Sequence, residues 1–291
     1  MKSIQLFLSS SRTGWRYSHA VRPSCCSYTV AITREVSPSI AKALTLNKGS
    51  DVSFVIAEEQ HKRYVETLRA IIPTISLPYL EDHPDCVFVE DTVVAVGKRA
   101  LLTRPGHVSR RGEVESMKTI LDQLGMEIFE IGPHDDARLD GGDVLYTGRH
   151  MMVGLSSRTN RQGYERLRAA FGAMTEVIPV HLPEGNNALH LKSMVTHLSE
   201  KTLVTLEGPE GDLLLERLPS DYAIVRVPDL LSCNVVSVNG NVLAQESESE
   251  ASKAVLNKAC EKEGLQPHWI DTSELAKVDG ALTCCSVLLD L

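Results

Sequence analysis

The repeating unit of the fold lies in residues 100–131, which read ALLTRPGHVSRRGEVESMKTILDQLGMEIFEI. The stretch opens with the apolar run Ala100 to Leu102 and closes with a second one, Ile128 to Ile131. Between Val114 and Leu124, apolar residues recur at intervals of three and four, as one buried face of a helix requires. The pattern therefore predicts a strand, a turn, a helix and a second strand.

The same order of elements recurs along the chain. Opening strands are predicted at residues 29–34, 151–155, 202–206 and 241–244, closing strands at residues 177–180, 223–227 and 268–270, and helices around residues 164–171 and 251–260. Five such units favour an α/β fold. They can form a doubly wound sheet or a ring of five blades, each with a helix outside, and periodicity alone leaves both open.

Composition narrows the class of protein. The 291 residues have the balance of a globular protein, and the net charge of -8 argues against nucleic acid as a partner. No apolar run is long enough to cross a bilayer. The seven cysteines include two adjacent pairs but no CxxC motif, and their spacing indicates neither a zinc site nor a disulfide framework. Reduced thiols in an intracellular compartment are the resulting expectation.

The amino-terminal segment differs from the rest. Residues 1–28 contain Lys2, Arg12, Arg16 and Arg22 and many serines, and the first acidic residue is Glu35. This composition is typical of a mitochondrial transit peptide, and the alternative is a leader without an address. We predict a leader over residues 1–28 and a single catalytic domain over residues 29–291. The protein is then cytoplasmic, or mitochondrial if the leader is a transit peptide.

The chemistry lies in strings that interrupt the repeat. In Pro84-Asp-Cys-Val-Phe-Val-Glu-Asp91, three acids flank an apolar run, which predicts a buried strand with carboxylates at both ends. Such carboxylates can bind a metal or a guanidinium group. Solvated turn residues are the alternative.

Three further strings carry candidate groups. The glycines of Leu139-Asp-Gly-Gly-Asp143 permit close approach of another group, although a hairpin turn explains them equally well. His190 lies among leucines, where a core role is the more common one. The thiols of Thr283-Cys-Cys-Ser286 are either small core residues or, with a histidine and an acid nearby, a nucleophile.

Taken in order, these strings resemble dimethylarginine dimethylaminohydrolase, a family within the guanidine-modifying superfamily of arginine deiminases and amidinotransferases. The resemblance covers residues 29–289. It is carried by the strings Asp-Cys-Val-Phe-Val-Glu-Asp, Leu-Thr-Arg-Pro-Gly, Leu-Asp-Gly-Gly-Asp-Val-Leu, Val-Gly-Leu-Ser-x-Arg-Thr-Asn, Leu-His-Leu-Lys-Ser and Val-Asp-Gly-x-Leu-Thr-Cys-Cys-Ser. It implies a five-bladed α/β propeller of ββαβ units around a central active site, the pentein fold.

The resemblance also implies roles for individual residues. Cys284 matches the nucleophile, His190 the acid/base, and Asp140 the group that orients the imidazole. Residues implied to contact the substrate are the acids Asp85, Glu90 and Asp91, the carboxylate-binding Arg110 and Arg158, the mobile-loop residue Leu44, and the backbone segment of Val278 and Asp279. No cofactor is implied, and zinc is expected only as an inhibitor bound at Cys284.

The implied reaction hydrolyses dimethyl- or monomethylarginine to citrulline and an amine, which relieves inhibition of nitric oxide synthesis. A small molecule is then the only expected partner, without nucleic acid or membrane, for a monomer or weak homodimer. Three alternatives remain at this stage: an arginine deiminase, an amidinotransferase, and a non-catalytic relative that acts as a binding protein.

Overall fold

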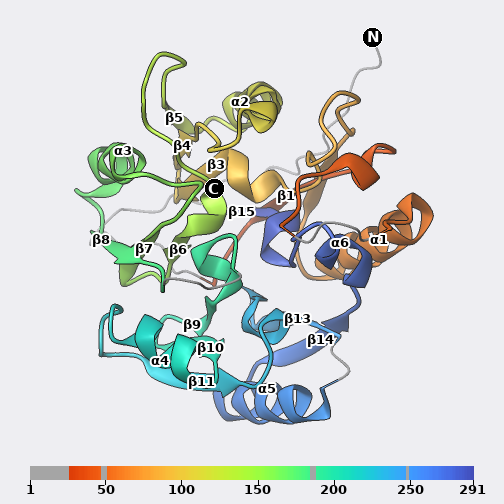
Figure 1. The fold of residues 1–291 in the computed structure, drawn as a ribbon, viewed down its shortest axis with the longest axis vertical. Coiled ribbons are helices and arrows are strands. Elements are labelled where there is room, and N and C mark those ends of the chain that lie inside the picture. The colour runs from red at the N-terminus through yellow and green to blue at the C-terminus, as the bar shows by residue number, and fades with distance from the viewer. Residues whose placement is uncertain (1–25, 47–50, 184–187, 247–248) are drawn as a thin grey trace, which may run out of the picture.

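The computed structural model describes residues 26–46, 51–183, 188–246 and 249–291. Within these residues, five three-stranded sheets surround a common axis, as Figure 1 shows. The prediction of a five-bladed α/β propeller is therefore confirmed, and the doubly wound sheet is excluded. Residues 1–25 of the predicted leader lie outside the residues that the structure describes.

The five blades share one topology. In each, the middle strand pairs antiparallel with an inner strand and parallel with an outer strand. The strands, given as inner, middle and outer, are β15 (Val287–Leu289), β1 (Val30–Arg34) and β2 (Thr74–Leu77); β3 (Val93–Val96), β4 (Arg99–Leu102) and β5 (Glu127–Glu130); β6 (Val144–Tyr146), β7 (His150–Leu155) and β8 (Glu176–His181); β9 (Val195–Ser199), β10 (Thr202–Leu206) and β11 (Ala223–Val227); and β12 (Val235–Val238), β13 (Asn241–Gln245) and β14 (Gln266–Ile270).

A helix connects the two parallel strands of every blade, because parallel strands need a crossover. These helices are α1 (Phe54–Ile71), α2 (Val114–Gln123), α3 (Arg161–Phe171), α4 (Pro209–Leu215) and α5 (Glu250–Glu263), and a short α6 (Ser273–Ala276) follows β14. Helices α1 to α5 lie on the outside of the ring (Figure 1). None of the helices in the described part of the chain is both long enough and apolar enough to span a membrane.

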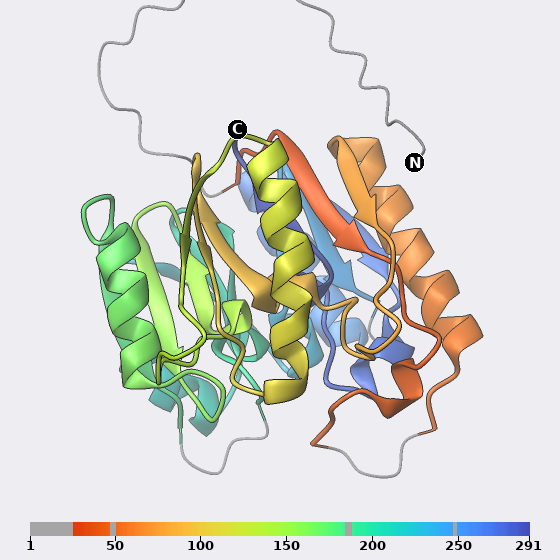
Figure 2. The same cartoon turned by 90° about the horizontal axis from the view of Figure 1, so that it is seen from above.

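Apolar side chains pack between neighbouring blades. One cluster joins Leu101 of β4 to Met151 of β7 and Phe171 of α3, all of which are buried. Figure 2 shows the helices packed against the strands of the ring. The core is thus distributed around the axis, and the ends of the inner strands remain available for polar residues.

The two ends of the domain close the ring. Strand β15 pairs antiparallel with β1 through Val30 and Leu289 and through Ile32 and Val287. All five residues of β1 are buried, and β1 also pairs with β2. The first blade therefore forms where the sequence resemblance begins, next to residue 29.

One local prediction is wrong. The string Asp85-Cys-Val-Phe-Val-Glu-Asp91 is not a strand but a series of tight turns that ends in the 3-10 turn η2 (Val89–Thr92). Its amides bond locally, from Phe88 N to Asp85 O and from Val89 N to Val87 O. The apolar run is buried because it lies at the centre of the ring, and not because it belongs to a sheet.

Candidate active site

Each inner strand is preceded by a short 3-10 turn. The turns are η2 before β3, η4 (Gly141–Asp143) before β6, η5 (Leu191–Ser193) before β9, η6 (Leu231–Cys233) before β12 and η7 (Thr283–Cys285) before β15. Turn η2 contacts η4 and η7, and η5 contacts η4 and η6. The fold therefore gathers five turns, one from each blade, at one place near the axis.

A pocket of about 330 Å³ lies at these turns. All the predicted site residues except Glu90 line it; the full lining is Leu44, Asp85, Phe88, Asp91, Arg110, Asp140, Arg158, Leu189, His190, Val278, Asp279 and Cys284. Residues that are up to 240 positions apart in the sequence thus share one cavity. Convergence of titratable groups in such a pocket is typical of an active site.

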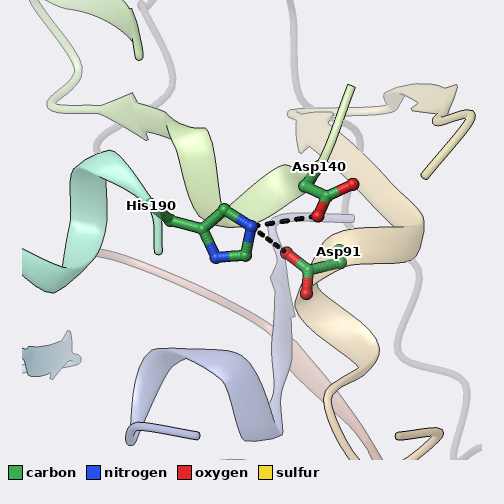
Figure 3. Close-up of side chains that lie close together, drawn as sticks. All are labelled: Asp91, Asp140 and His190. Carbon is green, nitrogen blue, oxygen red and sulfur yellow. Dashed lines mark hydrogen bonds and ion pairs between the residues drawn. The ribbon is translucent and has the colours of Figure 1, made fainter. Parts of the chain in front are cut away.

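One nitrogen of the His190 imidazole points toward two carboxylates, those of Asp140 and Asp91, as Figure 3 shows. Its Nε2 is 2.9 Å from Asp140 Oδ2 and 4.0 Å from Asp91 Oδ1. Burial alone lowers the pKa of His190, but Asp91, Asp143 and Asp140 outweigh it and raise the pKa to about 9. The imidazole is therefore protonated at neutral pH and can act as an acid.

Asp91 is held on both sides. Its Oδ1 accepts a hydrogen bond from Gly142 N at 2.9 Å, and its Oδ2 forms an ion pair with Arg110. Burial raises the pKa of Asp91, but His190, Arg110 and the Gly142 amide lower it to about 2. Asp91 is consequently ionised and faces the pocket as a fixed negative charge.

The two predicted carboxylate-binding arginines differ in their partners. Arg110 is buried and donates to Glu113 at 2.7 and 3.1 Å, to Asp91 and to the carbonyl of Phe88. Arg158 is half-buried and forms no ion pair with another described residue. Arg158 is thus the arginine with more guanidinium N–H groups free to bind an anionic group.

Cys284 is the partly exposed member of the adjacent thiol pair, whereas Cys285 is buried and donates to Ala281 O. Burial, together with Glu90 and Asp91, raises the pKa of the Cys284 thiol well above its usual value. A thiolate at neutral pH therefore requires a cation in the pocket to offset these carboxylates.

Glu90 lies outside the pocket, in contrast to the other predicted residues. Its carboxylate accepts from Lys192 Nζ at 2.5 Å and from Thr283 Oγ1 at 3.0 Å. All three residues line a second and larger cavity of about 980 Å³, which is bordered by the inner strands of the propeller. Glu90 therefore acts on the pocket through its charge and its hydrogen bonds and not as part of its wall.

The predicted loop residue Leu44 is tied to the pocket through backbone hydrogen bonds. Leu44 N donates to Asp85 Oδ1 at 3.0 Å, and Leu46 N donates to Asp279 Oδ2 at 2.5 Å. Asp279 has a positive φ of 57°, which is uncommon for a residue other than glycine. Burial raises the pKa of Asp85. These two carboxylates hold the loop over the pocket.

A metal ion has one possible set of ligands among the described residues. Asp91, Asp140 and His190 each offer an atom within 4.8 Å of the others. Cys284 is not in this set, and His190 must lose a proton before it can bind a metal. Inhibitory zinc at Cys284 stays a prediction.

Two residues that shape the site, Asp143 and Glu113, were not among the predicted site residues. Buried Asp143 accepts from Leu191 N at 3.0 Å and from Ser156 Oγ at 2.6 Å, which fixes the backbone next to His190. Glu113 is the buried partner of Arg110. The second aspartate of Asp-Gly-Gly-Asp offered a hint in the case of Asp143, but no pattern indicated Glu113.

Gly142 provides a test of the packing around the imidazole. A Cβ atom at this position would lie 2.6 Å from His190 Nδ1 and 2.9 Å from Asp91 Oδ1, too close for either group to keep its place. We expect Gly142→Ala to lower kcat by about 10- to 100-fold, because displacement of a catalytic group by about 1 Å costs that much. Gly132→Ala is the control, since its added Cβ meets nothing within 4 Å. Equal turnover by the two variants would contradict this geometry.

Comparison with known proteins shows the family of the chain. Residues 28–208 match the arginine deiminase family. The N(G),N(G)-dimethylarginine dimethylaminohydrolase of Streptomyces coelicolor is 35% identical over 265 residues, which cover 89% of this chain and 96% of that protein. The enzyme of the same name from Pseudomonas aeruginosa is 28% identical, with 88% of this chain and 97% of that protein covered.

A solved structure shares the whole fold. A cysteine-to-serine mutant of the Pseudomonas aeruginosa enzyme, complexed with citrulline, superposes with a TM-score of 0.78 at 26% identity over 90% of this chain and 99% of that one. The fold and the acid-rich pocket define a pentein of the guanidine-modifying superfamily. Within that superfamily, the chain belongs to the dimethylarginine dimethylaminohydrolase family.

Proposed function

We propose that the protein hydrolyses Nω,Nω-dimethyl-L-arginine, and also Nω-monomethyl-L-arginine, to L-citrulline and dimethylamine or methylamine. One observation carries the proposal: a thiol, an imidazole and several carboxylates from different blades converge on one pocket. The similar proteins from two bacteria are named for this activity, and one of them has been crystallised with citrulline.

The pocket can bind both ends of such a substrate. The carboxylates of Asp85 and Asp91 line the pocket and can hold the guanidinium group of the substrate by charge-assisted hydrogen bonds. Arg158 has guanidinium N–H groups free for the substrate's carboxylate, and Arg110 lies in the same wall. A cation that also carries a carboxylate therefore finds a partner of opposite charge for each group in the pocket lining.

The first half of the reaction follows from the charges around Cys284. A bound guanidinium offsets Glu90 and Asp91, so that the thiol gives its proton to solvent and the thiolate attacks the guanidinium carbon. His190 then donates a proton to the departing dimethylamine as the carbon–nitrogen bond breaks. A covalent thiouronium adduct on Cys284 remains.

The second half regenerates the thiol. His190, now neutral, takes a proton from a water molecule that attacks the adduct carbon. The new hydroxyl group then gives its proton to the sulfur as the carbon–sulfur bond breaks, which releases citrulline and the Cys284 thiol. Asp140 holds the imidazole at 2.9 Å throughout. Atoms balance, with one water consumed and one amine released.

The direct test measures citrulline from purified protein with asymmetric dimethylarginine, monomethylarginine and arginine side by side. Formation of citrulline from the two methylated substrates, and not from arginine, supports the proposal. Turnover of plain arginine moves the protein to the deiminase class, and formation of a guanidino product from an added amine indicates an amidinotransferase. If the folded protein forms no citrulline from any of the three substrates, this result contradicts the proposal and favours a binding role.

The environment of Cys284 also predicts a pH dependence. Because burial and carboxylates raise the pKa of this thiol, the thiolate fraction of the free protein grows only above the ordinary thiol value of about 8.5. Alkylation of Cys284 by neutral iodoacetamide should therefore keep rising with pH through that range. A cationic reagent such as 2-chloroacetamidine should react at least about tenfold faster near neutral pH, since its charge favours the thiolate.

The labelling is followed by mass spectrometry of the peptide that contains Cys284, so that other thiols do not contribute. Cys284→Ala provides the blank. A plateau of the iodoacetamide rate below pH 8 would show that the thiol is already activated without a cation.

A further inference from the structure

The turn η6 provides no residue of the proposed reaction, unlike the other four turns. Asp91 lies in η2, Asp140 directly precedes η4, His190 directly precedes η5, and Cys284 lies in η7. The residue that directly follows η6 is Asn234, which is 3% exposed. It does not line the small pocket. A buried amide at this position requires an explanation in terms of its hydrogen bonds.

Asn234 connects two other blades. Its Oδ1 accepts from Thr283 N at 2.9 Å. Its Nδ2 donates to Lys192 O at 2.9 Å and to Thr283 Oγ1 at 3.0 Å. Both N–H groups of the amide are thereby used, and the side chain joins the turn of the nucleophile to the segment of the histidine.

These bonds are part of a closed ring of four residues, which we term the clamp: Asn234, Lys192, Glu90 and Thr283. Lys192 Nζ donates to Glu90 Oε1 at 2.5 Å, and Thr283 Oγ1 donates to Glu90 Oε2 at 3.0 Å. Asn234 closes the ring between Lys192 and Thr283. The ring spans four blades and belongs to no single sheet.

Each of the other clamp residues is a close sequence neighbour of a reactive one. Thr283 immediately precedes Cys284, Glu90 immediately precedes Asp91, and Lys192 is two residues after His190. The hydrogen bonds that hold a clamp residue in place therefore also restrict the position of the neighbouring reactive residue. The clamp thus couples the positions of three groups that no continuous element of the chain connects.

We propose that Asn234 is a positioning residue of the active site, which sets the placement of Cys284 relative to His190 through the clamp. The inference rests on the proposed function, since it assigns a role in that reaction. Nucleophilic attack and proton transfer depend on the geometry of these two groups. Binding of the substrate's carboxylate depends on Arg158 in the pocket wall, which the clamp does not contact.

The test compares Asn234→Ala with the wild type in citrulline assays over a range of dimethylarginine concentrations. We expect kcat to fall by about 10- to 100-fold, the effect of small misplacement of catalytic groups, while KM changes by less than about threefold. The matched control is Asn239→Ala in the same blade. Asn239 also bonds through its amide to another segment, at Tyr28 N and Tyr28 O, but it is remote from the clamp.

A second variant guards against loss of folding. Thr283→Val keeps the branched shape and the backbone bond to Asn234 but removes the hydroxyl that joins Asn234 to Glu90. If the clamp acts as proposed, Thr283→Val lowers kcat in the same way as Asn234→Ala. The fold-loss in kcat of the double variant, which carries both substitutions, is then smaller than the product of the two single fold-losses, because contacting residues act as one unit. A merely structural effect would appear in the melting temperature and not in this coupling of kcat.

Four outcomes decide against the inference. They are a folded Asn234→Ala with kcat within threefold of the wild type, a rise in KM at unchanged kcat, multiplicative losses in the double variant, and, if Asn234→Ala does not fold, full activity of Thr283→Val. If the wild type itself forms no citrulline, the proposed function fails separately. The rate of Cys284 alkylation by iodoacetamide then tests the clamp, which requires that Asn234→Ala change this rate and that Asn239→Ala leave it as in the wild type.

Discussion

We expect Cys284→Ser to abolish citrulline formation from dimethylarginine, with a loss on the order of 10⁶-fold in kcat, as for removal of a nucleophile elsewhere. A serine hydroxyl has nearly the same shape, so that the pocket and its carboxylates stay in place. However, its proton is far harder to remove than that of a thiol, and the positive charge of the bound guanidinium is too small an effect to compensate for the difference. The variant should therefore bind substrate and stop before the first covalent step.

Mass spectrometry of protein quenched during turnover checks this expectation. The wild type should carry a thiouronium adduct on the peptide of Cys284, and the serine variant should carry none. Cys285→Ala is the matched control, because Cys285 is the adjacent thiol but is buried in the apolar core. An adduct found on Cys285, or on the serine variant, would overturn the assignment of the nucleophile.

The repeating part of the fold could be predicted from local patterns. The middle strands, the outer strands β5, β8, β11 and β14, and the helices α2, α3 and α5 were predicted as apolar runs or amphipathic segments, whereas β2, α1 and α4 were not. The inner strands were not predicted. Strand β12 is the apolar run Val235-Val-Ser-Val238, but it is only four residues long and directly follows the turn η6, and β9 is interrupted by Thr196 and His197. Short inner strands acquire their conformation from pairing within the ring.

Closure of the ring could not be deduced from any local pattern. It depends on pairing of β1 with β15, for example through the hydrogen bond from Thr29 N to Leu289 O, and these residues are 260 positions apart. Local periodicity contains no information about such a contact. The resemblance to a known family supplied it instead.

The candidate site divides in the same way. Cys284, His190 and Asp140 lie in strings that were singled out, and the structure brings all three to one pocket. Their supporting residues could not be found in this manner, because the partner of Arg110 is Glu113 and the partner of Thr283 is Asn234, each recognisable only in space. Glu90 was predicted as a direct contact, but Lys192 and Thr283 hold its carboxylate outside the pocket.

His190→Asn should lower kcat by about 10²- to 10⁴-fold while dimethylarginine still binds, which is the range for loss of a general acid and base. The asparagine amide reaches only the position of the imidazole Nδ1, so it replaces neither the Nε2 bond to Asp140 nor the proton transfer to the departing amine. Turnover is measured as citrulline and binding by calorimetry on the variant. His197→Gln is the control, because His197 lies in β9 and does not line the small pocket.

The same substitution removes a charge that stabilises the fold in a defined pH range. Because Asp91, Asp143 and Asp140 raise the pKa of His190 to about 9, its protonated form stabilises the folded state fully below the unfolded value of about 6.5, and this contribution is lost as pH rises through about 9. The melting temperature of His190→Asn should therefore lie below that of the wild type near pH 6, and the difference should narrow towards pH 9 and above. A difference that stays constant with pH, together with turnover within tenfold of the wild type, would show that the imidazole is neither charged nor catalytic.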